Sequence, residues 1–410
     1  MPEITLNIPI VGNRWPVGLA FQLHIVIVAF IMGIAILAPI AEWRGLRPGG
    51  EHWEMLARDL SQTIGRLFAF GATWAVFALV LIFGLYPRLF GVLTGIFFWP
   101  LVVVGGIWFV MTVSAYLYYA TWERLGRRRG LHLAIGATFA TSAFVFITLI
   151  TELSSFQLTP SDPSRLLTAA LNPSWPTEIV HRHIGNVSYA GLLLAGYAGV
   201  RALFPPLGRG LDLAHYDWLG DVALIVGISL ALLQPLGGWF YTRQVQLASP
   251  GAYERMMIGE NAWMFLAQAF FLDAVLFLGN VYLSLSVRRR GKPDRKSASW
   301  MEKSLWVIAI LALLLIVPKE LPLGQMMPWK YISLAGLVAL TAVNLGLYLR
   351  ERRCFHWGTG GRGLQLALAL IGVSIVALMV TMGVIRSSAR GGYPIYGQMA
   401  PGEAQQIESP

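Results

Sequence analysis

The sequence predicts an all-α integral membrane protein, a single polytopic bundle of about ten transmembrane helices. Hydrophobic residues make up 56% of the 410 residues and charged residues only 13%, whereas a soluble domain carries about a quarter charged residues. The mean hydropathy is +0.61. Apolar stretches recur along the whole chain and leave no room for a soluble domain of any size. We therefore expect one membrane domain over residues 1–410.

Ten stretches are long enough to cross a hydrocarbon core, which takes roughly 20 residues. They lie at 17–42, 67–87, 92–120, 131–152, 179–203, 217–240, 257–286, 302–318, 330–349 and 364–385. The boundary between the second and third is short, because only Tyr86, Pro87, Arg88 and a few neighbours separate them.

Basic residues concentrate in the odd-numbered loops between these spans. The third loop carries Arg124, Arg127, Arg128 and Arg129, the seventh Arg288, Arg289, Arg290, Lys292, Arg295 and Lys296, and the ninth Arg350, Arg352, Arg353 and Arg362. The fourth loop, about 153–178, holds only Arg165 with Asp162 and Glu178. The positive-inside rule then places odd loops in the cytoplasm and both termini in the periplasm of a bacterial inner membrane. The net charge of +10 comes from these loops and does not indicate a nucleic-acid partner.

Three side chains typical of haem ligands occur at one membrane depth. His24, His181 and Met257 each lie in the first turns of a span that starts on the periplasmic side. Imidazole and thioether are axial ligands of haem iron, and an intramembrane histidine indicates a functional site. The single cysteine, Cys354, excludes covalent c-type haem and an iron–sulfur cluster held by the chain's own thiolates. The pattern predicts a membrane haem protein that handles electrons, although a histidine here could instead donate to a carbonyl.

The remaining intramembrane polar residues have more than one interpretation. His183 is two residues from His181, so on a helix its side chain points about 200° away from that of His181. It is either a second haem ligand or a hydrogen-bonding neighbour. Asp273, midway along the seventh span, belongs to a proton path or to an inter-helix polar contact, and we favour the contact. Four further histidines lie in or beside loops and are expected to be solvated: His52, His132, His215 and His356.

Four short motifs occur in order within residues 15–290. They are Phe21-Gln22-Leu23-His24, Trp122-Glu123-Arg124-Leu125-Gly126, Leu171-Asn172-Pro173 ahead of Val180-His181, and Arg255-Met256-Met257-Ile258-Gly259. Together they resemble the large subunit (subunit I) of cytochrome bd quinol oxidases. The resemblance implies that His181 and Met257 are the two ligands of one low-spin haem b beside Arg255, and that His24 is available for a second haem. Outside this bd-like core we place three additional spans at 300–386 and an extracytoplasmic tail at 387–410.

The chain departs from the resembled family at three acidic positions. Val103 and Met111 stand where the family has glutamates in its third helix, and Ser387 stands where it has a glutamate in a C-terminal segment similar to residues 386–393. Oxygen reduction consumes protons beside buried iron and needs a titratable relay. We therefore expect a divergent member that lacks several of the oxidase carboxylates.

The predicted quinol site also differs, because only about 241–256 joins the sixth and seventh spans where the family has a long loop. A quinol head group needs a hydrogen-bond acceptor or general base. Glu254 and Glu260 could serve, and Arg243 or Arg255 could hold an oxyanion or a haem propionate. The alternative is that these four are ordinary interfacial charges.

These expectations combine into one predicted function, with two alternatives. The chain is predicted to be the haem-b-bearing membrane subunit of a cytochrome bd-like oxidoreductase, moving electrons between quinol or quinone and a partner redox protein at the periplasmic face. Expected partners are a second integral membrane subunit, a periplasmic c-type multihaem or iron–sulfur protein, quinone and membrane lipid. The alternatives are a complete bd-type quinol:oxygen oxidoreductase and a haem-free structural anchor for redox partners.

Overall fold

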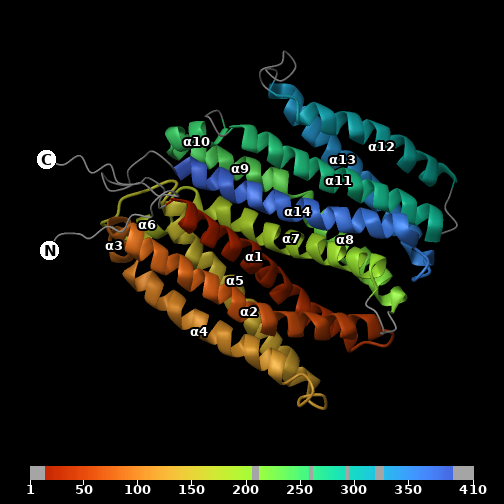
Figure 1. Ribbon diagram of the computed structural model, residues 1–410, viewed down its shortest axis with the longest axis horizontal. Helices are drawn as coiled ribbons and strands as arrows, with labels where there is room; N and C mark the ends of the chain where they lie inside the picture. The colour runs from red at the N-terminus through yellow and green to blue at the C-terminus, as the bar shows by residue number, and fades with distance from the viewer. Residues whose placement is uncertain (1–13, 206–211, 258–261, 291–294, 319–326, 391–410) are drawn as a thin grey trace. The chain divides into compact units, whose positions relative to one another are not determined.

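The computed structural model describes residues 14–205, 212–257, 262–290, 295–318 and 327–390 (Figure 1). These residues form helices joined by turns and contain no strand, which confirms the all-α class. The helices are α1 (Arg14–Gly45), α2 (Glu51–Leu85), α3 (Pro87–Ile96), α4 (Phe98–Ala120), α5 (Arg129–Phe156), α6 (Leu166–Ala170), α7 (Trp175–Leu203), α8 (Leu213–Ala231), α9 (Gln234–Ala248), α10 (Pro250–Met257), α11 (Ala262–Arg290), α12 (Arg295–Leu315), α13 (Met327–Glu351) and α14 (Gly361–Arg390), with a 3₁₀ turn at Arg352–Cys354.

Nine stretches of the described residues are long and apolar enough to cross a membrane, so the multi-pass architecture is confirmed. The predicted sixth span corresponds to α8 and α9 together, since the candidate span runs over Leu213–Ala248. Pro235 lies near the break between these helices, where it cannot continue the hydrogen-bond ladder. The predicted fifth span, α7, is not among the nine. At 29 residues it is roughly 44 Å long and can span the bilayer, but polar side chains such as His181, Arg182 and Asn186 lower its hydropathy.

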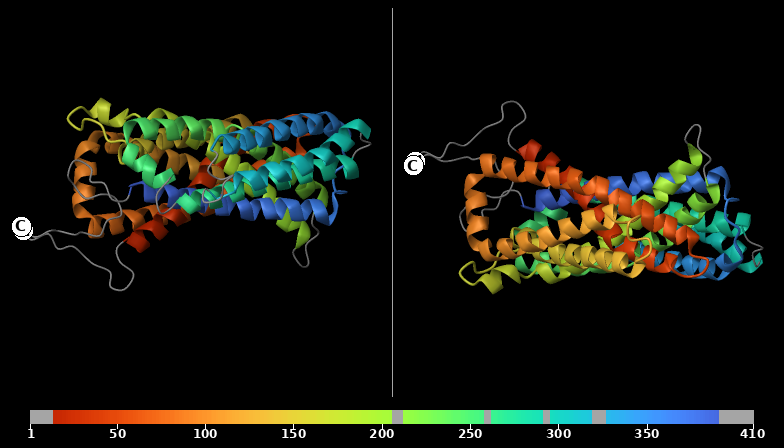
Figure 2. Two further views of the ribbon diagram at one scale, coloured as in Figure 1. Left: turned by 90° about the horizontal axis from the view of Figure 1, so that it is seen from above. Right: turned by 90° about the horizontal axis from the view of Figure 1, so that it is seen from below.

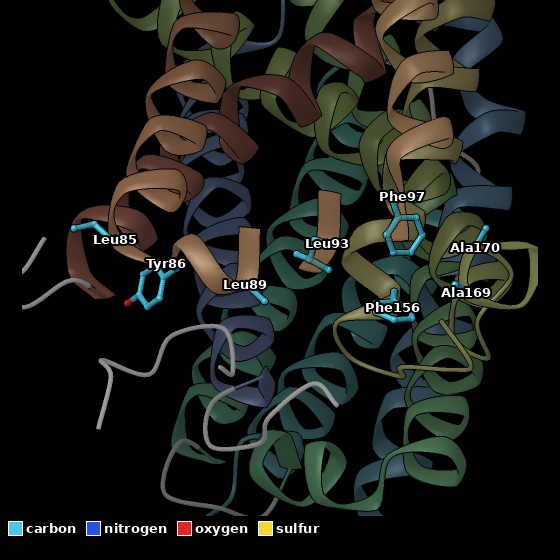
Figure 3. Close-up of a cluster of buried hydrophobic side chains, with 8 residues drawn as sticks. All are labelled: Leu85, Tyr86, Leu89, Leu93, Phe97, Phe156, Ala169 and Ala170. Atoms are coloured by element: carbon cyan, nitrogen blue, oxygen red, sulfur yellow. The ribbon is translucent and has the colours of Figure 1, made fainter. Parts of the chain in front are cut away.

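The short boundary between the predicted second and third spans is a helix of its own. Pro87 begins α3, a position where its fixed φ and missing N–H are tolerated, and α3 runs across the space between the ends of α2 and α4 (Figure 2). Its apolar side packs into a buried cluster with the end of α5 and with α6 (Figure 3). The cluster contains Leu85, Tyr86, Leu89, Leu93, Phe97, Phe156, Ala169 and Ala170. The third span therefore begins at Phe98, not at residue 92.

The chain divides into two compact units. Unit 1 comprises residues 1–183, 236–262 and 383–410, and unit 2 comprises residues 184–235 and 263–382. Within unit 1, α1 packs against α2 and α5, and α4 packs against α2 and α5. The predicted ligands His24, His181 and Met257 all belong to unit 1.

Unit 2 is held together by close helix contacts and buried polar groups. The Asn280 amide donates to Thr341 Oγ1 at 2.8 Å, and the Asn344 amide donates to Asn280 Oδ1 at 2.8 Å, which joins α11 to α13. Arg290, buried at the end of α11, pairs with Asp217 of α8. A Cβ built on Gly196 of α7 would overlap the Cα of Gly372 of α14. These two helices therefore touch backbone to backbone.

Candidate functional site

The imidazole of His181 lies against α9. A Cβ built on Gly237 would lie 3.4 Å from His181 Nδ1, and one on Gly238 would lie 3.4 Å from Cε1. One turn further along α9, the ring of Tyr241 faces the imidazole with centroids 6.1 Å apart and planes 24° apart. Because the two glycines have no side chains, they leave a cradle of backbone beside the imidazole.

Glu178, one helical turn before His181, is buried with 2% of its side chain exposed. Its carboxylate accepts hydrogen bonds from the Arg386 guanidinium, from the Tyr241 hydroxyl at 3.2 Å and from Ser154 Oγ at 3.0 Å. A second guanidinium, Arg182 Nη1, lies 3.9 Å from Glu178 Oε1. Arg182 Nη1 also donates to Thr151 Oγ1 at 2.9 Å. One carboxylate thus faces two positive charges, one helical turn before His181.

His24 is half-buried on α1, and its Nδ1 lies 3.0 Å from the Gly71 carbonyl oxygen of α2. A carbonyl only accepts, so Nδ1 must carry the hydrogen, and in a neutral ring Nε2 then keeps its lone pair. The carbonyl contact considered as an alternative is therefore present. It also orients the ring in the way that a second-shell partner orients a ligating histidine.

The last turns of α14 contact both the helix that carries His24 and the helix that carries His181. A Cβ on Gly383 of α14 would overlap the Gln22 amide of α1, two residues before His24. One turn later on α14, Arg386 binds Glu178 of α7, and Glu178 contacts α9 through Tyr241.

His183 faces a different neighbour. Its ring stacks on Phe144 of α5, with centroids 3.9 Å apart and planes 15° apart. Its Nε2 lies 2.9 Å from Thr148 Oγ1, a hydroxyl that itself donates to the Phe144 carbonyl. His183 therefore makes the hydrogen bond considered for it, and its partner lies on α5, on the side of α7 away from the Gly237–Gly238 cradle.

The other predicted site residues lie on α9 and α10. Met257 is half-buried and is the last described residue of α10, and the described part of the seventh span begins at Ala262 in α11. Arg255 is half-buried on α10, and Glu254 is exposed. Arg243 is exposed on α9 and donates to Gln246 Oε1 at 2.6 Å. Glu260 lies outside the described residues.

Two histidines expected to be solvated are buried, and that expectation was wrong. His132 is fully buried on α5, where Nδ1 lies 2.7 Å from Glu42 Oε1 and Nε2 donates to the Tyr118 carbonyl at 2.9 Å. His215 is 4% exposed in the first turn of α8 and stacks on Trp218, with centroids 5.9 Å apart. In both cases the loop-facing end of the helix is covered by neighbouring aromatic side chains.

Asp273 also differs from the expectation. Its side chain is buried, and within the described part of the chain neither of its carboxyl oxygens has a hydrogen-bond partner. The inter-helix polar contact that we favoured is therefore not found.

The motif residues and the replaced acids have clear structural environments. Asn172 is buried and its amide donates to Ser155 Oγ at 2.8 Å, which ties the turn before α7 to α5. Trp122 packs edge-on to His132 at 5.0 Å. Of the replacements for family glutamates, Val103 is exposed, Met111 is buried and Ser387 is exposed. None of the three side chains has a carboxyl group that could bind and release a proton.

Intramembrane imidazoles beside a buried charge network, on a multi-pass helical bundle, define the class as a polytopic membrane protein with a polar site inside its helices. The sequence profile of cytochrome bd terminal oxidase subunit I matches residues 13–404. The chain therefore belongs to the cytochrome bd terminal oxidase subunit I family, as the motifs predicted.

A solved structure has the same fold. The bd oxidase from Geobacillus thermodenitrificans superposes with a TM-score of 0.55 and 16% sequence identity, covering 91% of this chain and 96% of that chain. A search of the curated proteins gave no match.

Proposed function

We propose that this chain is the haem-b-bearing subunit of a bd-type membrane complex and that it passes electrons from quinol towards a partner redox protein at the periplasmic face. The observation that carries the proposal is the arrangement at the start of α7. There the His181 imidazole lies in the Gly237–Gly238 cradle, one turn from the Glu178–Arg386 pair. Because the motifs around His181 and Met257 resemble the family's ligand motifs, we assign these two side chains as the axial ligands of the haem iron.

The residues present fit a haem in three respects. Haem iron needs only axial ligands, which an imidazole and a thioether supply. The glycine pair presents no side chain to the Nδ1 and Cε1 atoms of His181, and the Nδ1 contact of His24 leaves Nε2 free to ligate a second haem. A bound haem b would supply the one-electron carrier.

The neighbouring side chains supply a proton acceptor for quinol oxidation. The Tyr241 hydroxyl already donates to Glu178 Oε2 at 3.2 Å, so its oxygen can accept a proton from a quinol hydroxyl while its own hydrogen moves to the carboxylate. Arg386 and Arg182 place two guanidiniums beside that carboxylate. Glu178 therefore takes the role predicted for Glu254 and Glu260.

Partners follow from the family and from the missing carboxylates. A bd-type subunit I is expected to act with a second integral membrane subunit and with quinone. With Val103, Met111 and Ser387 in place of acids, we propose that electrons leave for a periplasmic redox protein. The comparisons lend no support to a c-type multihaem or iron–sulfur partner, so its identity is part of the proposal.

A second candidate function is a complete quinol:oxygen oxidoreductase, which the family's description as a terminal oxidase favours. It requires other groups to deliver the protons that the replaced acids would carry. It also requires a haem with an open coordination position for oxygen.

Haem quantification with reduced-minus-oxidised spectra on the purified complex tests the proposal. We expect a low-spin haem b that is lost or converted in His181→Ala and in Met257→Leu and unchanged in His356→Ala, an exposed histidine of the loop before α14. A high-spin band that shifts with carbon monoxide would instead support the oxidase. A complex without haem would overturn both candidate functions and would support the haem-free structural anchor.

A further inference from the structure

A second buried titratable pair lies at the far end of α1 from His24. Glu42 is 18 residues after His24, about 27 Å along the helix. It meets His132 from the first turn of α5 and Tyr118 from the end of α4. The exposed fractions are 2% for Glu42 and 0% for both His132 and Tyr118. All three belong to unit 1, at the end where the positive-inside rule places the cytoplasm.

The hydrogen bonds show that one proton is shared by the pair. His132 Nε2 faces the Tyr118 carbonyl at 2.9 Å and must therefore carry a hydrogen. His132 Nδ1 lies 2.7 Å from Glu42 Oε1, and two bare acceptors would repel at that distance. The contact thus contains a hydrogen, either as a carboxylic acid donating to neutral imidazole or as an imidazolium donating to carboxylate.

Two further polar atoms lie in the buried surroundings of the pair. Within the described residues, Glu42 Oε2 and the Tyr118 hydroxyl make no hydrogen bond of normal geometry, and the hydroxyl and the carboxyl group are close enough to interact with each other. The Tyr118 ring stacks on His132 at 4.6 Å, and a Cβ on Gly136 would lie 2.6 Å from Tyr118 Cε2. The carboxyl group therefore has a second oxygen through which a proton can enter or leave, beside a hydroxyl able to carry it.

The charged side chains described at this end of unit 1 have partners other than Glu42 and His132. Arg58 of α2 binds Glu123 at 2.5 Å, Arg129 of α5 binds Glu54 of α2, and Arg44 of α1 lies over Trp53, 5.3 Å from its ring centroid. Arg129 also lies over Trp122, which covers His132. A gain or loss of a proton at Glu42 and His132 is therefore not absorbed by an adjacent ion pair.

We propose that Glu42 and His132 form a buried proton-binding site that exchanges a proton with the solvent at this end of unit 1. Uptake of one proton converts the neutral pair to a carboxylic acid beside an imidazolium, and release restores the shared hydrogen. No electron transfer or other reactant is required. The site is independent of haem binding at His181, so it stands or fails separately from the proposed function.

Infrared difference spectroscopy of the full-length protein in lipid, titrated with acid and base, tests this site. We expect the C=O band of a protonated carboxylic acid to change with pH and to shift in D₂O. The band is lost in Glu42→Gln, displaced in His132→Gln and unchanged in Glu54→Gln, a half-exposed glutamate of the same end. Glu42→Asp, which keeps a carboxyl, displaces the band without removing it.

The outcome that overturns the proposal is a pH-dependent spectrum that is identical in wild type and in folded Glu42→Gln. That result would make the pair a fixed structural contact. If Glu42→Gln does not fold, Glu42→Asp decides, because an undisplaced band in that variant contradicts the assignment.

Discussion

Glu178 shows how much one residue's environment depends on where a helix begins. Glu178 was predicted to lie in a loop, because it ends the segment between the fourth and fifth spans and the fifth span was expected to start at residue 179. The helix starts instead at Trp175, which puts Glu178 one turn before His181 on the same face. A polar residue three positions before an intramembrane histidine was the signal that could have identified it. Arg386, 208 residues away in sequence, had no such signal.

At this residue we predict strong coupling between Glu178 and Arg386. Glu178→Gln leaves two guanidiniums facing a neutral group and should lower the free energy of unfolding by about 3 kcal/mol, as expected when one partner of a buried pair is removed. The double variant Glu178→Gln with Arg386→Gln should recover part of that loss. Thermal unfolding in detergent across the four proteins measures the coupling. Simply additive losses would show that the two side chains act independently.

Tyr241 gives a prediction about activity. Tyr241→Phe keeps the ring beside His181 but removes the hydroxyl that donates to Glu178. Quinol oxidation should slow by about 10²-fold, the lower range for a general acid–base group, with haem content unchanged. Tyr331→Phe, at an exposed tyrosine of α13, is the matched control. An unaltered steady-state rate in Tyr241→Phe would remove Tyr241 from the proton path.

At the scale of the helices, hydropathy locates apolar segments but not the breaks within them. The sixth span was predicted as one segment, and it is two helices separated near Pro235. The third was predicted to begin at residue 92, whereas Pro87–Ile96 is the separate helix α3. In both places the composition stays apolar across the break, and the change of direction comes from a proline and from tertiary packing. Span positions were therefore predictable, and helix ends were not.

Helix packing in unit 2 predicts a steric requirement at Gly196. Any Cβ there would overlap the Cα of Gly372, and backbone atoms cannot turn aside as a flexible side chain can. Gly196→Leu should separate α7 from α14 and cost about 1–3 kcal/mol, the usual range for overpacking. Gly346→Ala, where no atom lies within 4 Å of the added Cβ, should be neutral. Yield of folded protein by size-exclusion chromatography compares the two, and equal yields would contradict the close contact.

At the scale of the whole molecule, loop charge predicts the orientation of the chain in the membrane. The single cysteine, Cys354, is exposed beside the arginines of the ninth loop, which the positive-inside rule places in the cytoplasm. A membrane-impermeant maleimide should therefore label Cys354 in inside-out vesicles and not in intact spheroplasts. No cysteine needs to be introduced or removed for this experiment, because Cys354 is the single cysteine. Labelling of detergent-solubilised protein gives the maximum signal for comparison. Labelling from the periplasmic side would reverse the topology.

Long-range pairings are the part of the site that sequence reasoning did not provide. The motifs predicted the family and singled out His24, His181 and Met257, because each stands in a short run of neighbours with a characteristic order. Glu42 and His132 are 90 positions apart and have no shared motif, so each was judged from its own surroundings. Such pairs become visible only when packing brings α1 and α5 together.

The polarity of α7 has a consequence for how the protein is made. A charged side chain at the centre of an isolated helix costs about 2.5–3.5 kcal/mol on insertion. In its first turns, α7 carries Arg182 with a histidine on either side, His181 and His183. Left by itself at the translocon, this segment would partition poorly into lipid. Its Arg182 gains a hydrogen-bond acceptor from α5, which emerges before it, and its Glu178 gains a counter-charge from Arg386 of α14, which emerges last. The helix bearing the proposed iron ligand should therefore be fully embedded only after synthesis of the chain is nearly finished, which also delays the moment at which cofactor can be captured.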